Sequence, residues 1–582
     1  MTPGQADLVR STFAIAASRV PDGETLASLF YARLFERHPE MRHLFSEDIT
    51  LQAQRMVDTL ASMVENVDQP DVLAGMLIPL GRRHGPYGAA ARQFEPVIAA
   101  IGSVVAEGCG ADWSPEAAQA WSEVFGEVER LFLAGLDHAG SEQDSTPQIV
   151  SFAQTAAAEY RSYNQEQVDA ICAAIVKAGW DNRVMLAEMA VEETEMGRVR
   201  SKVVKNELCT RGVWDDIRDL RTVGVIGGSV EDGVLEVAQP MGVVLAVIPV
   251  TNPTSTTLFK IISALKARNS VIVTAAGRAR DCTNEAARIA YQAALAAGAP
   301  PNVIQWVPRP NRDTTQKLMA QKDIAIIMAT GGEGLVTSAY SSGTPALGVG
   351  AGNVPVLVHS SGDLDLVADN VIESKNFDYG TICASEQSIV VTQDRAAQLI
   401  AEFEQRGALL LSDEEAEKLG AIAVDPDRGT MNPKIVGRDA SSIAAAAGID
   451  APPDVTLLIA PQTKVGIQAP LSQEILAPII CLYVEPDEPA ALARTIELNH
   501  YGGVGHTAVI YANDIEAVGR FGNMVTAGRV LVNVGSSTGA VGGGTALFPS
   551  MTLGCGTQGG NITTINVTSR DLMNIQRVAF PR

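Results

Sequence analysis

The hydrophobic residues of the chain are spaced as in helices up to about residue 138. Ala27, Phe30, Tyr31 and Leu34 fall at positions i, i+3, i+4 and i+7, which lie on one face of a helix. The same kind of spacing predicts further helices over residues 51–67, 72–83, 94–106 and 114–136. No stretch before residue 140 has a convincing strand pattern. Residues 1–138 are therefore predicted to form an all-α unit.

The pattern changes after residues 139–150, a polar, Pro-containing segment that is typical of an interdomain linker. A helical stretch over residues 151–195 comes next, and short apolar runs then alternate with helical patterns. The apolar runs, predicted as buried parallel strands, are residues 243–250, 270–274, 303–307, 324–329 and 354–358. The helices predicted among them are residues 254–266, 281–297, 313–321, 334–341 and 364–375. This alternation indicates a doubly wound parallel sheet.

The composition of the 582 residues, 46% hydrophobic and 19% charged, is that of an ordinary globular protein. A net charge of −23 argues against a nucleic-acid partner and against binding to anionic membranes. The longest apolar run, residues 241–250, is about half of the roughly 20 residues that cross a bilayer. Seven dispersed cysteines, with no CxxC pair and no signal peptide, predict reduced thiols in a cytoplasmic protein.

One of these cysteines, Cys383, lies between a tight turn predicted at Gly380 and the apolar run 389–391. A cysteine at the start of a strand can be a nucleophile, since a backbone N–H there can point at the group that the sulfur attacks. It can equally be a buried structural thiol. Asn252, directly after a buried strand, also has two interpretations: an oxyanion donor in the crevice, or a cap of the next helix.

Doubly wound sheets bind nucleotides where the strand ends meet helix N-termini. Residues 330–334 read TGGEG, follow a predicted strand and begin a helix, so a pyrophosphate could approach them. The glycines could also serve the turn alone. Arg278, after another strand, could contact an adenosine ribose or its phosphate, or be a solvated loop charge.

His84 ends a predicted helix, where its imidazole could ligate haem iron or cap the helix. The pattern FY-x3-F-x3-PE-x4-F at residues 30–45 resembles the globin family, specifically the bacterial globins of flavohaemoglobins and globin-coupled sensors. The resemblance covers most of residues 1–138. Phe94 stands where flavohaemoglobins usually have a tyrosine, and no flavin-reductase domain follows, which argues against NO dioxygenation. The resemblance implies a haem site with His84 as proximal iron ligand, Tyr31 and Gln54 as donors to bound gas, and Phe45 packed on the porphyrin.

Five motifs in the second part of the chain resemble the aldehyde dehydrogenase superfamily. The similarity is greatest to its CoA-acylating branch, which includes the aldehyde dehydrogenase half of bifunctional aldehyde–alcohol dehydrogenases. The motifs are TNPTS at 251–255, YSSGTPALGVGAGNVP at 340–355, FDYGTICASE at 377–386, GVGHT at 503–507 and TLGCG at 552–556. They lie in the family's order within residues 149–582. The resemblance implies a nucleotide-binding domain at 151–375, a catalytic domain at 376–535, and a C-terminal arm at 536–582 that could serve oligomerisation.

The resemblance also implies roles for individual residues. Cys383 is the nucleophile that adds to an aldehyde, and Asn252 with the Cys383 backbone N–H holds the oxyanion. His506 is an acid/base group or a CoA contact, or it only shapes its loop. The residues implied for cofactor binding are Thr251, Pro253, Thr330, Gly331, Gly332 and, at the nicotinamide ribose, Glu474.

Hydrolytic members carry a general-base glutamate in a Glu-Leu-Gly-Gly-Lys segment, and the corresponding residues 348–353 here read GVGAGN, without a carboxylate. With no base to activate water, the Cys383 thioester is expected to pass to CoA. We therefore predict reversible oxidation of a short aldehyde, acetaldehyde first, to acyl-CoA with NAD or NADP. The alternatives are an acylating sulfoacetaldehyde dehydrogenase, and a haem-based gas or redox sensor for O2, NO or CO with the dehydrogenase as its output. A homo-oligomer is expected.

Overall fold

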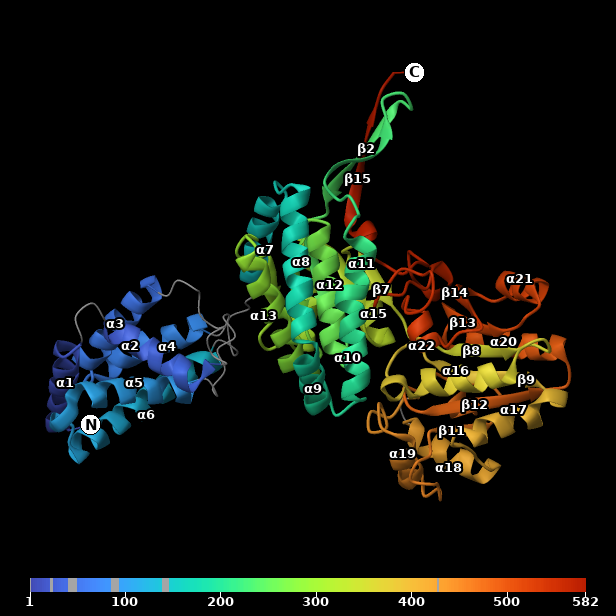
Figure 1. Cartoon of the computed structure of the whole chain (residues 1–582), viewed down its shortest axis with the longest axis horizontal. Helices are drawn as coiled ribbons and strands as arrows, with labels where there is room; N and C mark the ends of the chain where they lie inside the picture. Colours follow the sequence, from blue (N-terminus) through green and yellow to red (C-terminus); the bar gives the residue numbers. More distant parts are fainter. Residues whose placement is uncertain are drawn as a thin grey trace. The chain divides into compact units, whose positions relative to one another are not determined.

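The computed structural model describes residues 2–20, 25–39, 50–84, 94–138, 146–425 and 429–581. The chain divides into two compact units, Met1–Asp144 and Ser145–Arg582 (Figure 1). The division falls inside the segment predicted as a linker, and the helix α7 (Thr146–Tyr160) begins within that segment.

The first unit is all-helical in its described residues, as the sequence predicts. Its helices are α1 (Pro3–Ser18), α2 (Leu26–Arg37), α3 (Thr50–Glu65), α4 (Pro70–His84), α5 (Phe94–Cys109) and α6 (Pro115–His138). Their apolar faces pack together through fully or almost fully buried side chains, among them Leu34, Leu77 and Trp121. The Trp121 indole donates to the Thr12 hydroxyl at 2.9 Å, so this core also satisfies its polar groups.

The second unit begins with the helices α7, α8 (Gln165–Asp181), α9 (Arg183–Thr194) and α10 (Val199–Glu207). They precede a five-stranded parallel sheet of order β5-β4-β3-β6-β7. Its strands are β3 (Val243–Val247), β4 (Ser270–Thr274), β5 (Ile304–Trp306), β6 (Ile324–Thr330) and β7 (Ala346–Val349). Hydrophobic residues cover both faces of the sheet, since alternate β3 residues belong to two different core clusters.

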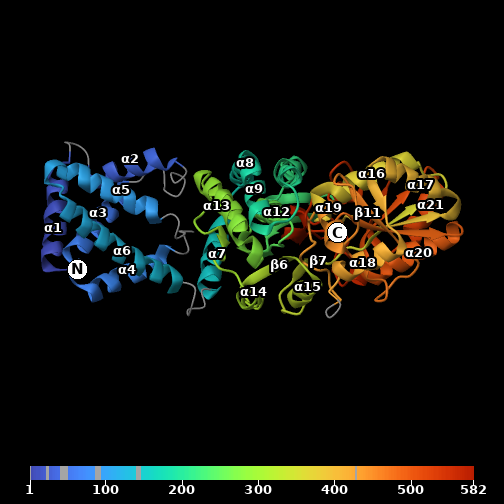
Figure 2. The ribbon, with the colours of Figure 1, turned by 90° about the horizontal axis from the view of Figure 1, so that it is seen from below.

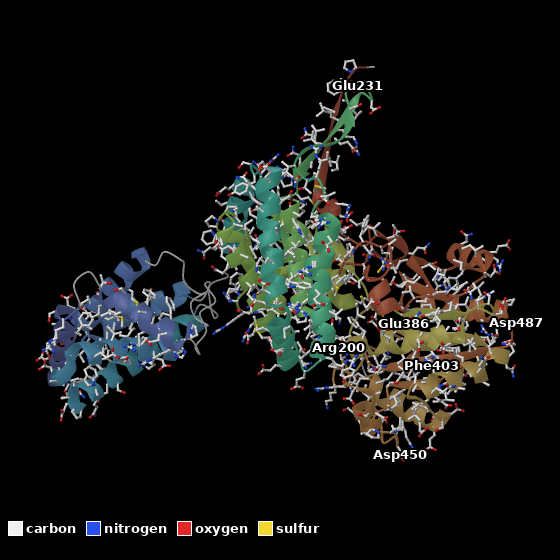
Figure 3. The ribbon with its side chains drawn as sticks, viewed as in Figure 1. Arg200, Glu231, Glu386, Phe403, Asp450 and Asp487 are labelled. Carbon is white, nitrogen blue, oxygen red and sulfur yellow. The ribbon has the colours of Figure 1, made fainter. Side chains whose placement is uncertain are left out.

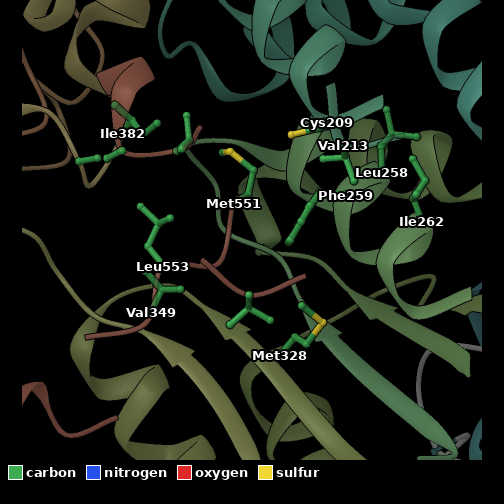
Figure 4. Close-up of a cluster of buried hydrophobic side chains, with 14 of the residues drawn as sticks. Cys209, Val213, Leu258, Phe259, Ile262, Met328, Val349, Ile382, Met551 and Leu553 are labelled. Carbon is green, nitrogen blue, oxygen red and sulfur yellow. The ribbon is translucent and has the colours of Figure 1, made fainter. Parts of the chain in front are cut away.

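Four helices connect these strands: α12 (Pro253–Lys266), α13 (Arg280–Ala296), α14 (Arg312–Met319) and α15 (Glu333–Tyr340). The side chains of α12 pack into a core cluster that also contains Met328 of β6 and Val349 of β7 (Figure 4). The same cluster contains Ile382 and Leu553, which are outside the five-stranded sheet. The segment next to Cys383 therefore packs against the core of the half that contains the five-stranded sheet.

A second parallel sheet has seven strands in the order β10-β11-β12-β9-β8-β13-β14. They are β8 (Val354–Val358), β9 (Glu386–Thr392), β10 (Ala408–Leu410), β11 (Leu457–Pro461), β12 (Ile479–Glu485), β13 (Gly505–Tyr511) and β14 (Ala527–Val532). Figure 2 shows the half of the second unit that contains this sheet, with β11 labelled. The strand predicted at 354–358 exists, but it pairs with β9 and β13 and not with the nucleotide-binding sheet. The helix α16 (Leu364–Asn376) follows it. This half also contains α17 (Gln393–Gln405), α18 (Asp413–Ala423), α19 (Ala440–Ala447), α20 (Glu488–Gly502), α21 (Ile515–Met524) and α22 (Ser536–Gly539).

A three-stranded antiparallel sheet forms an arm that projects from the second unit (Figures 1 and 3). It consists of β1 (Gly224–Ser229), β2 (Val234–Pro240) and β15 (Met573–Ala579), with β2 in the middle. Glu231 lies in the turn at the tip of the arm (Figure 3). The C-terminal strand is part of the arm predicted from the resemblance, whereas β1 and β2 were not predicted. Among the described residues, no helix has the length and apolarity needed to cross a membrane.

Candidate active site

Cys383 lies in a tight loop between α16 and β9, and the loop begins with an unusual turn. Asp378, Tyr379 and Gly380 are consecutive residues with positive φ, at 53°, 51° and 72°. For residues other than glycine this conformation costs about 1–2 kcal/mol each, so the surrounding structure must hold it in place. Cys383 follows the turn and is partly exposed. The sequence predicted a turn at Gly380 and missed the two strained residues before it.

The carboxylate of Asp378 holds this turn. It is fully buried and accepts from the Lys205 ammonium at 2.5 Å, the Lys202 ammonium at 3.0 Å and the Thr381 hydroxyl at 2.7 Å. Its other oxygen accepts the backbone N–H of Arg198 at 2.8 Å. Burial alone would raise the pKa of Asp378, but the two ammonium groups outweigh it and hold that pKa below its usual value. The turn is thus tied to α10 by an ionised carboxylate.

The other end of the loop is held by Glu386, the first residue of β9 (Figure 3). This buried carboxylate accepts the backbone N–H of Ser536 at 2.6 Å and the hydroxyl of Ser374 at 2.7 Å. Buried, hydrogen-bonded carboxylates thus hold both ends of the Cys383 loop, Asp378 at one end and Glu386 at the other.

Asn252 lies immediately before α12 and its side chain makes no cap hydrogen bond to that helix. The capping interpretation is therefore wrong. Its Oδ1 accepts from the Lys205 ammonium at 2.6 Å, and its Nδ2 donates to the Thr251 hydroxyl at 3.2 Å. An amide nitrogen has two N–H groups, so one is left to donate to a ligand. Lys205 also donates to the backbone oxygen of Thr381 at 3.1 Å, two residues before Cys383.

Burial raises the pKa of the Cys383 thiol to about 12, with smaller contributions from Glu474 and Cys555, while Arg529 opposes the shift. The carboxylate of Glu474 accepts a hydrogen bond from the backbone N–H of Gly352 at 2.9 Å. Gly352 belongs to residues 348–353, the segment without a carboxylate. Burial raises the pKa of Glu474 to about 7.

Gly352 lies directly against Cys383. A Cβ atom added at Gly352 would come within 2.0 Å of the Cys383 carbonyl oxygen and 3.2 Å of His506 Nδ1. No side chain can be accommodated there without moving the loop. Gly352 thus meets Cys383 with its backbone only.

His506 is the second residue of β13 and is fully buried. Its Nδ1 lies 2.9 Å from the Thr507 hydroxyl, and its Nε2 is enclosed with no hydrogen-bond partner among the described residues. Burial and the nearby Arg529 lower its pKa to about 3. The imidazole is therefore neutral at physiological pH and no atom of it is open to solvent, which favours the loop-shaping interpretation. Cys555, also buried, has a raised pKa and no feature of a second nucleophile.

The nucleotide end of the site lies after β6. Gly332 precedes α15 without a side-chain cap, and a Cβ added at Gly332 or Gly334 would meet nothing within 4 Å. The Thr330 hydroxyl is buried and has no partner among the described residues. Free N–H groups, open space and an unpaired hydroxyl fit a dinucleotide phosphate. Arg278 donates to the Thr194 backbone oxygen at 3.3 Å, and its role stays open.

The haem residues predicted in the first unit are described only in part. Tyr31 is buried in α2, with its ring 4.9 Å from that of Phe30 and 5.7 Å from that of Phe35, and burial raises its pKa. Gln54 and His84 lie in α3 and α4, but their side chains are outside the described residues, as is all of Phe45. Within the described part of the chain, no cluster of three or more His, Cys, Asp or Glu residues could hold a metal ion.

Lys202, Lys205 and Arg529 were not predicted as site residues. The two lysines are three residues apart on α10, a spacing that is usual for a solvated helix face. Only the pairing with Asp378, which is 173 residues from Lys205, reveals that they are buried. Arg529 donates to four oxygen atoms around His506 and Cys555, and its sequence context gives no signal of this.

Comparison with known proteins gives two family matches. A model described as aldehyde dehydrogenase family matches residues 134–546, and a model described as globin matches residues 28–130. The aldehyde-alcohol dehydrogenase of Clostridium acetobutylicum is 40% identical over 446 residues, which are 76% of this chain and 51% of that protein. The chain thus spans about half the length of the aldehyde-alcohol dehydrogenases that it matches.

Two further relatives match over almost their whole length. The acylating sulfoacetaldehyde dehydrogenase of Bilophila wadsworthia is 36% identical over 441 residues, covering 74% of this chain and 94% of that protein. The crystal structure of an acetylating aldehyde dehydrogenase from Geobacillus thermoglucosidasius is 42% identical, with a TM-score of 0.74 over 75% of this chain and 96% of that one.

Proposed function

Because the chain belongs to the aldehyde dehydrogenase family, we propose that its second unit oxidises a short aldehyde to an acyl-CoA through a thioester on Cys383. The carrying observation is the site itself. The backbone of Gly352 packs against the Cys383 carbonyl, and residues 348–353, which correspond to the glutamate segment of hydrolytic members, contain no carboxylate. The names of the acetylating and acylating relatives support CoA as the acceptor.

The residues of the chain divide the chemistry between them. The Cys383 thiol releases its proton to solvent, its sulfur adds to the aldehyde carbon, and the carbonyl oxygen becomes an oxyanion. The free N–H of Asn252 and the backbone N–H of Cys383 donate to that oxyanion, and one such donor is worth about 2.7–4 kcal/mol in the transition state. After hydride loss the carbonyl re-forms as a thioester. The CoA thiol then attacks this carbon, the Cys383 sulfur leaves as a thiolate, and the proton of the CoA thiol returns Cys383 to its thiol form.

The dinucleotide would be held by the residues after β6 and by the segment before α12. Thr330, Gly331 and Gly332 offer N–H groups and a hydroxyl to the phosphates, Thr251 and Pro253 lie beside Asn252, and Glu474 would hold the nicotinamide ribose. When bound, the nicotinamide accepts the hydride. NAD and NADP both remain candidates.

For the substrate we propose acetaldehyde, because the C. acetobutylicum and G. thermoglucosidasius relatives are named for aldehyde–alcohol and acetylating activities. Sulfoacetaldehyde is the alternative, and the B. wadsworthia relative supports it. Comparing kcat/KM for the two aldehydes at saturating CoA separates them. We also propose that copies of the chain assemble through the arm, whose exposed apolar residues are Val225, Val230, Val578 and Phe580.

For the first unit we propose haem binding with His84 as the iron ligand, on the basis of the globin match. The buried aromatic face of α2 around Tyr31 fits an apolar haem pocket. A Soret band in the purified protein that disappears in His84→Ala would support it, and an unchanged spectrum would refute it. Equal dehydrogenase rates of the deoxy, O2-bound and CO-bound forms would eliminate the sensor hypothesis.

The dehydrogenase is tested by mixing protein, aldehyde and NAD or NADP with and without CoA. We expect acyl-CoA and reduced cofactor only when CoA is present, and release of free acid at the same rate without CoA would refute the assignment. Cys383→Ala should abolish turnover. Cys481→Ala is the matched control, because burial raises the pKa of that thiol to about 12 as well, on the nearby strand β12.

A further inference from the structure

The two oxyanion donors come from separate segments of the chain. Asn252 lies between β3 and α12, and the Cys383 backbone N–H belongs to the loop before β9. A donor pair works only if both N–H groups point at the same oxygen position. Something must therefore fix these two segments against each other.

The Lys205 ammonium makes contact with both. It is almost fully buried on α10, and its three N–H groups are used by three acceptors: Asn252 Oδ1 at 2.6 Å, Asp378 Oδ2 at 2.5 Å and the Thr381 backbone oxygen at 3.1 Å. The first acceptor is the oxyanion donor of one segment. The other two belong to the loop of the other segment, within five residues of Cys383. Lys205 also lies 5.4 Å from the centre of the Phe377 ring, in the same loop.

The chemistry of an ammonium group determines the orientation of Asn252. The two ends of an amide have nearly the same shape, so sterics alone hardly distinguish Oδ1 from Nδ2. An ammonium group can only donate hydrogen bonds. It therefore bonds to Oδ1, which accepts, and cannot bond to Nδ2, which also donates. The Asn252 N–H groups must then point the other way, toward Thr251 and the crevice. A cation on the amide oxygen also strengthens the amide N–H as a donor.

Lys202 provides an internal comparison on the same helix, three residues earlier. It pairs with the same oxygen of Asp378, at 3.0 Å, and is buried to the same extent. Its other acceptor is the Thr251 backbone oxygen at 2.9 Å, so it does not touch the Asn252 amide. Neutralising Asp378 is thus shared by two lysines, whereas the contact with Asn252 Oδ1 is made by Lys205.

We propose that Lys205 is a positioning residue for the reaction: it fixes the rotamer of the Asn252 amide and joins it to the Cys383 loop, so that both oxyanion donors converge. This role rests on the proposed function, since it presupposes an oxyanion at Cys383. Lys205 itself does not contact substrate.

The test is a double-mutant cycle on the first-turnover rate of cofactor reduction, with Asn252→Ala, Lys205→Met and the combined variant. We expect each single variant to lose about 10²-fold, as for the loss of one oxyanion donor. If Lys205 acts mainly through Asn252, adding Lys205→Met to Asn252→Ala slows the reaction by far less than about 10²-fold, and the KM for aldehyde changes far less than the rate. Losses that multiply in the combined variant would overturn the proposal.

Lys202→Met is the matched control, because it removes a buried ammonium from the same carboxylate. We expect a loss clearly smaller than that of Lys205→Met, and an equal loss would also overturn the proposal. Should Lys205→Met fail to fold, Lys205→Gln retains a donor for Oδ1, and its rate should exceed that of Asn252→Ala. Alkylation of Cys383 by iodoacetamide at the wild-type rate shows that the loop is intact. A wild-type protein without CoA-dependent turnover would defeat the proposed function instead and would be seen in the reference arm.

Discussion

Replacing Asp378 by asparagine should strongly destabilise the second unit, because this carboxylate neutralises two buried ammonium groups. Asparagine has nearly the same volume and tolerates a φ of 53° as well as aspartate does. The variant therefore removes the charge and leaves the backbone of the turn without added strain. The decrease in the free energy of unfolding therefore measures the contribution of the ion cluster, and not that of the backbone conformation of residue 378.

The magnitude follows from the partners that remain. Removing one member of a buried ion pair costs about 3–5 kcal/mol, because the other charge stays buried without compensation. Here two lysines are left, both with almost no exposed surface. Burial already lowers the pKa of Lys205 to about 8, with Asp378 opposing that shift, so the variant's lysine should release its proton more easily. We expect a loss of about 3–5 kcal/mol at pH 7 that shrinks toward pH 9.

In the wild type, acidification also reduces the contribution of Asp378 to the free energy of unfolding. The pKa of Asp378 is lowered in the folded protein, so its stabilisation is present above the unfolded pKa near 4. It is lost as the pH falls through the lower folded pKa. The difference in the free energy of unfolding between the wild type and Asp378→Asn should therefore become smaller as the pH falls.

Urea unfolding followed by circular dichroism, with hydrogen exchange of α10 and of the loop at 377–385, measures the change in the second unit separately from the first. Asp181→Asn is the control, since its pair with Lys177 is exposed on both sides and should contribute below about 1 kcal/mol. A loss for Asp378→Asn no larger than this control would refute the reasoning.

Two further predictions concern the neighbours of Cys383. Gly352→Ala should reduce turnover by about 10²-fold or more, because its Cβ would displace the Cys383 carbonyl, whereas Gly350→Ala, with open space around its Cβ position, should stay within about threefold; steady-state assays of both variants decide it. The wild-type free energy of unfolding should decline between about pH 5 and 7, because the folded state keeps a proton on Glu474 that the unfolded state has released, and Glu474→Gln should remove this decline. Urea titrations at several pH values measure it, and the same dependence of the free energy on pH in both proteins would contradict the prediction.

The sequence predicts much of the nucleotide-binding half because its strands are buried on both faces and its helices end at clear stop signals. The strands predicted at 270–274 and 354–358 coincide with β4 and β8. The sheet to which β8 belongs could not be predicted, because its partners β9 and β13 are set by tertiary pairing. The strands β1 and β2 of the arm were missed, since β1 is half exposed, β2 is only partly buried and neither has a long apolar run.

The candidate site shows the same division. Cys383 and Asn252 stand in recognisable motifs, and the structure connects their segments through Lys202 and Lys205, of which Lys205 contacts the Asn252 amide itself. Both lysines lie in the polar stretch VRSKVVKNE, where nothing local indicates burial. Their environment depends on Asp378, whose own conformation depends on the lysines. This mutual dependence cannot be predicted from the sequence of either segment alone.

The strained turn at Asp378 and Tyr379 also sets an order of assembly. Two left-handed residues in succession are unfavourable in an isolated segment, and the cations that hold them lie on a helix about 170 residues earlier in the chain. The loop can acquire its final shape only after the two halves of the second unit have docked. A nascent or half-folded chain therefore cannot yet hold the Cys383 loop in this conformation.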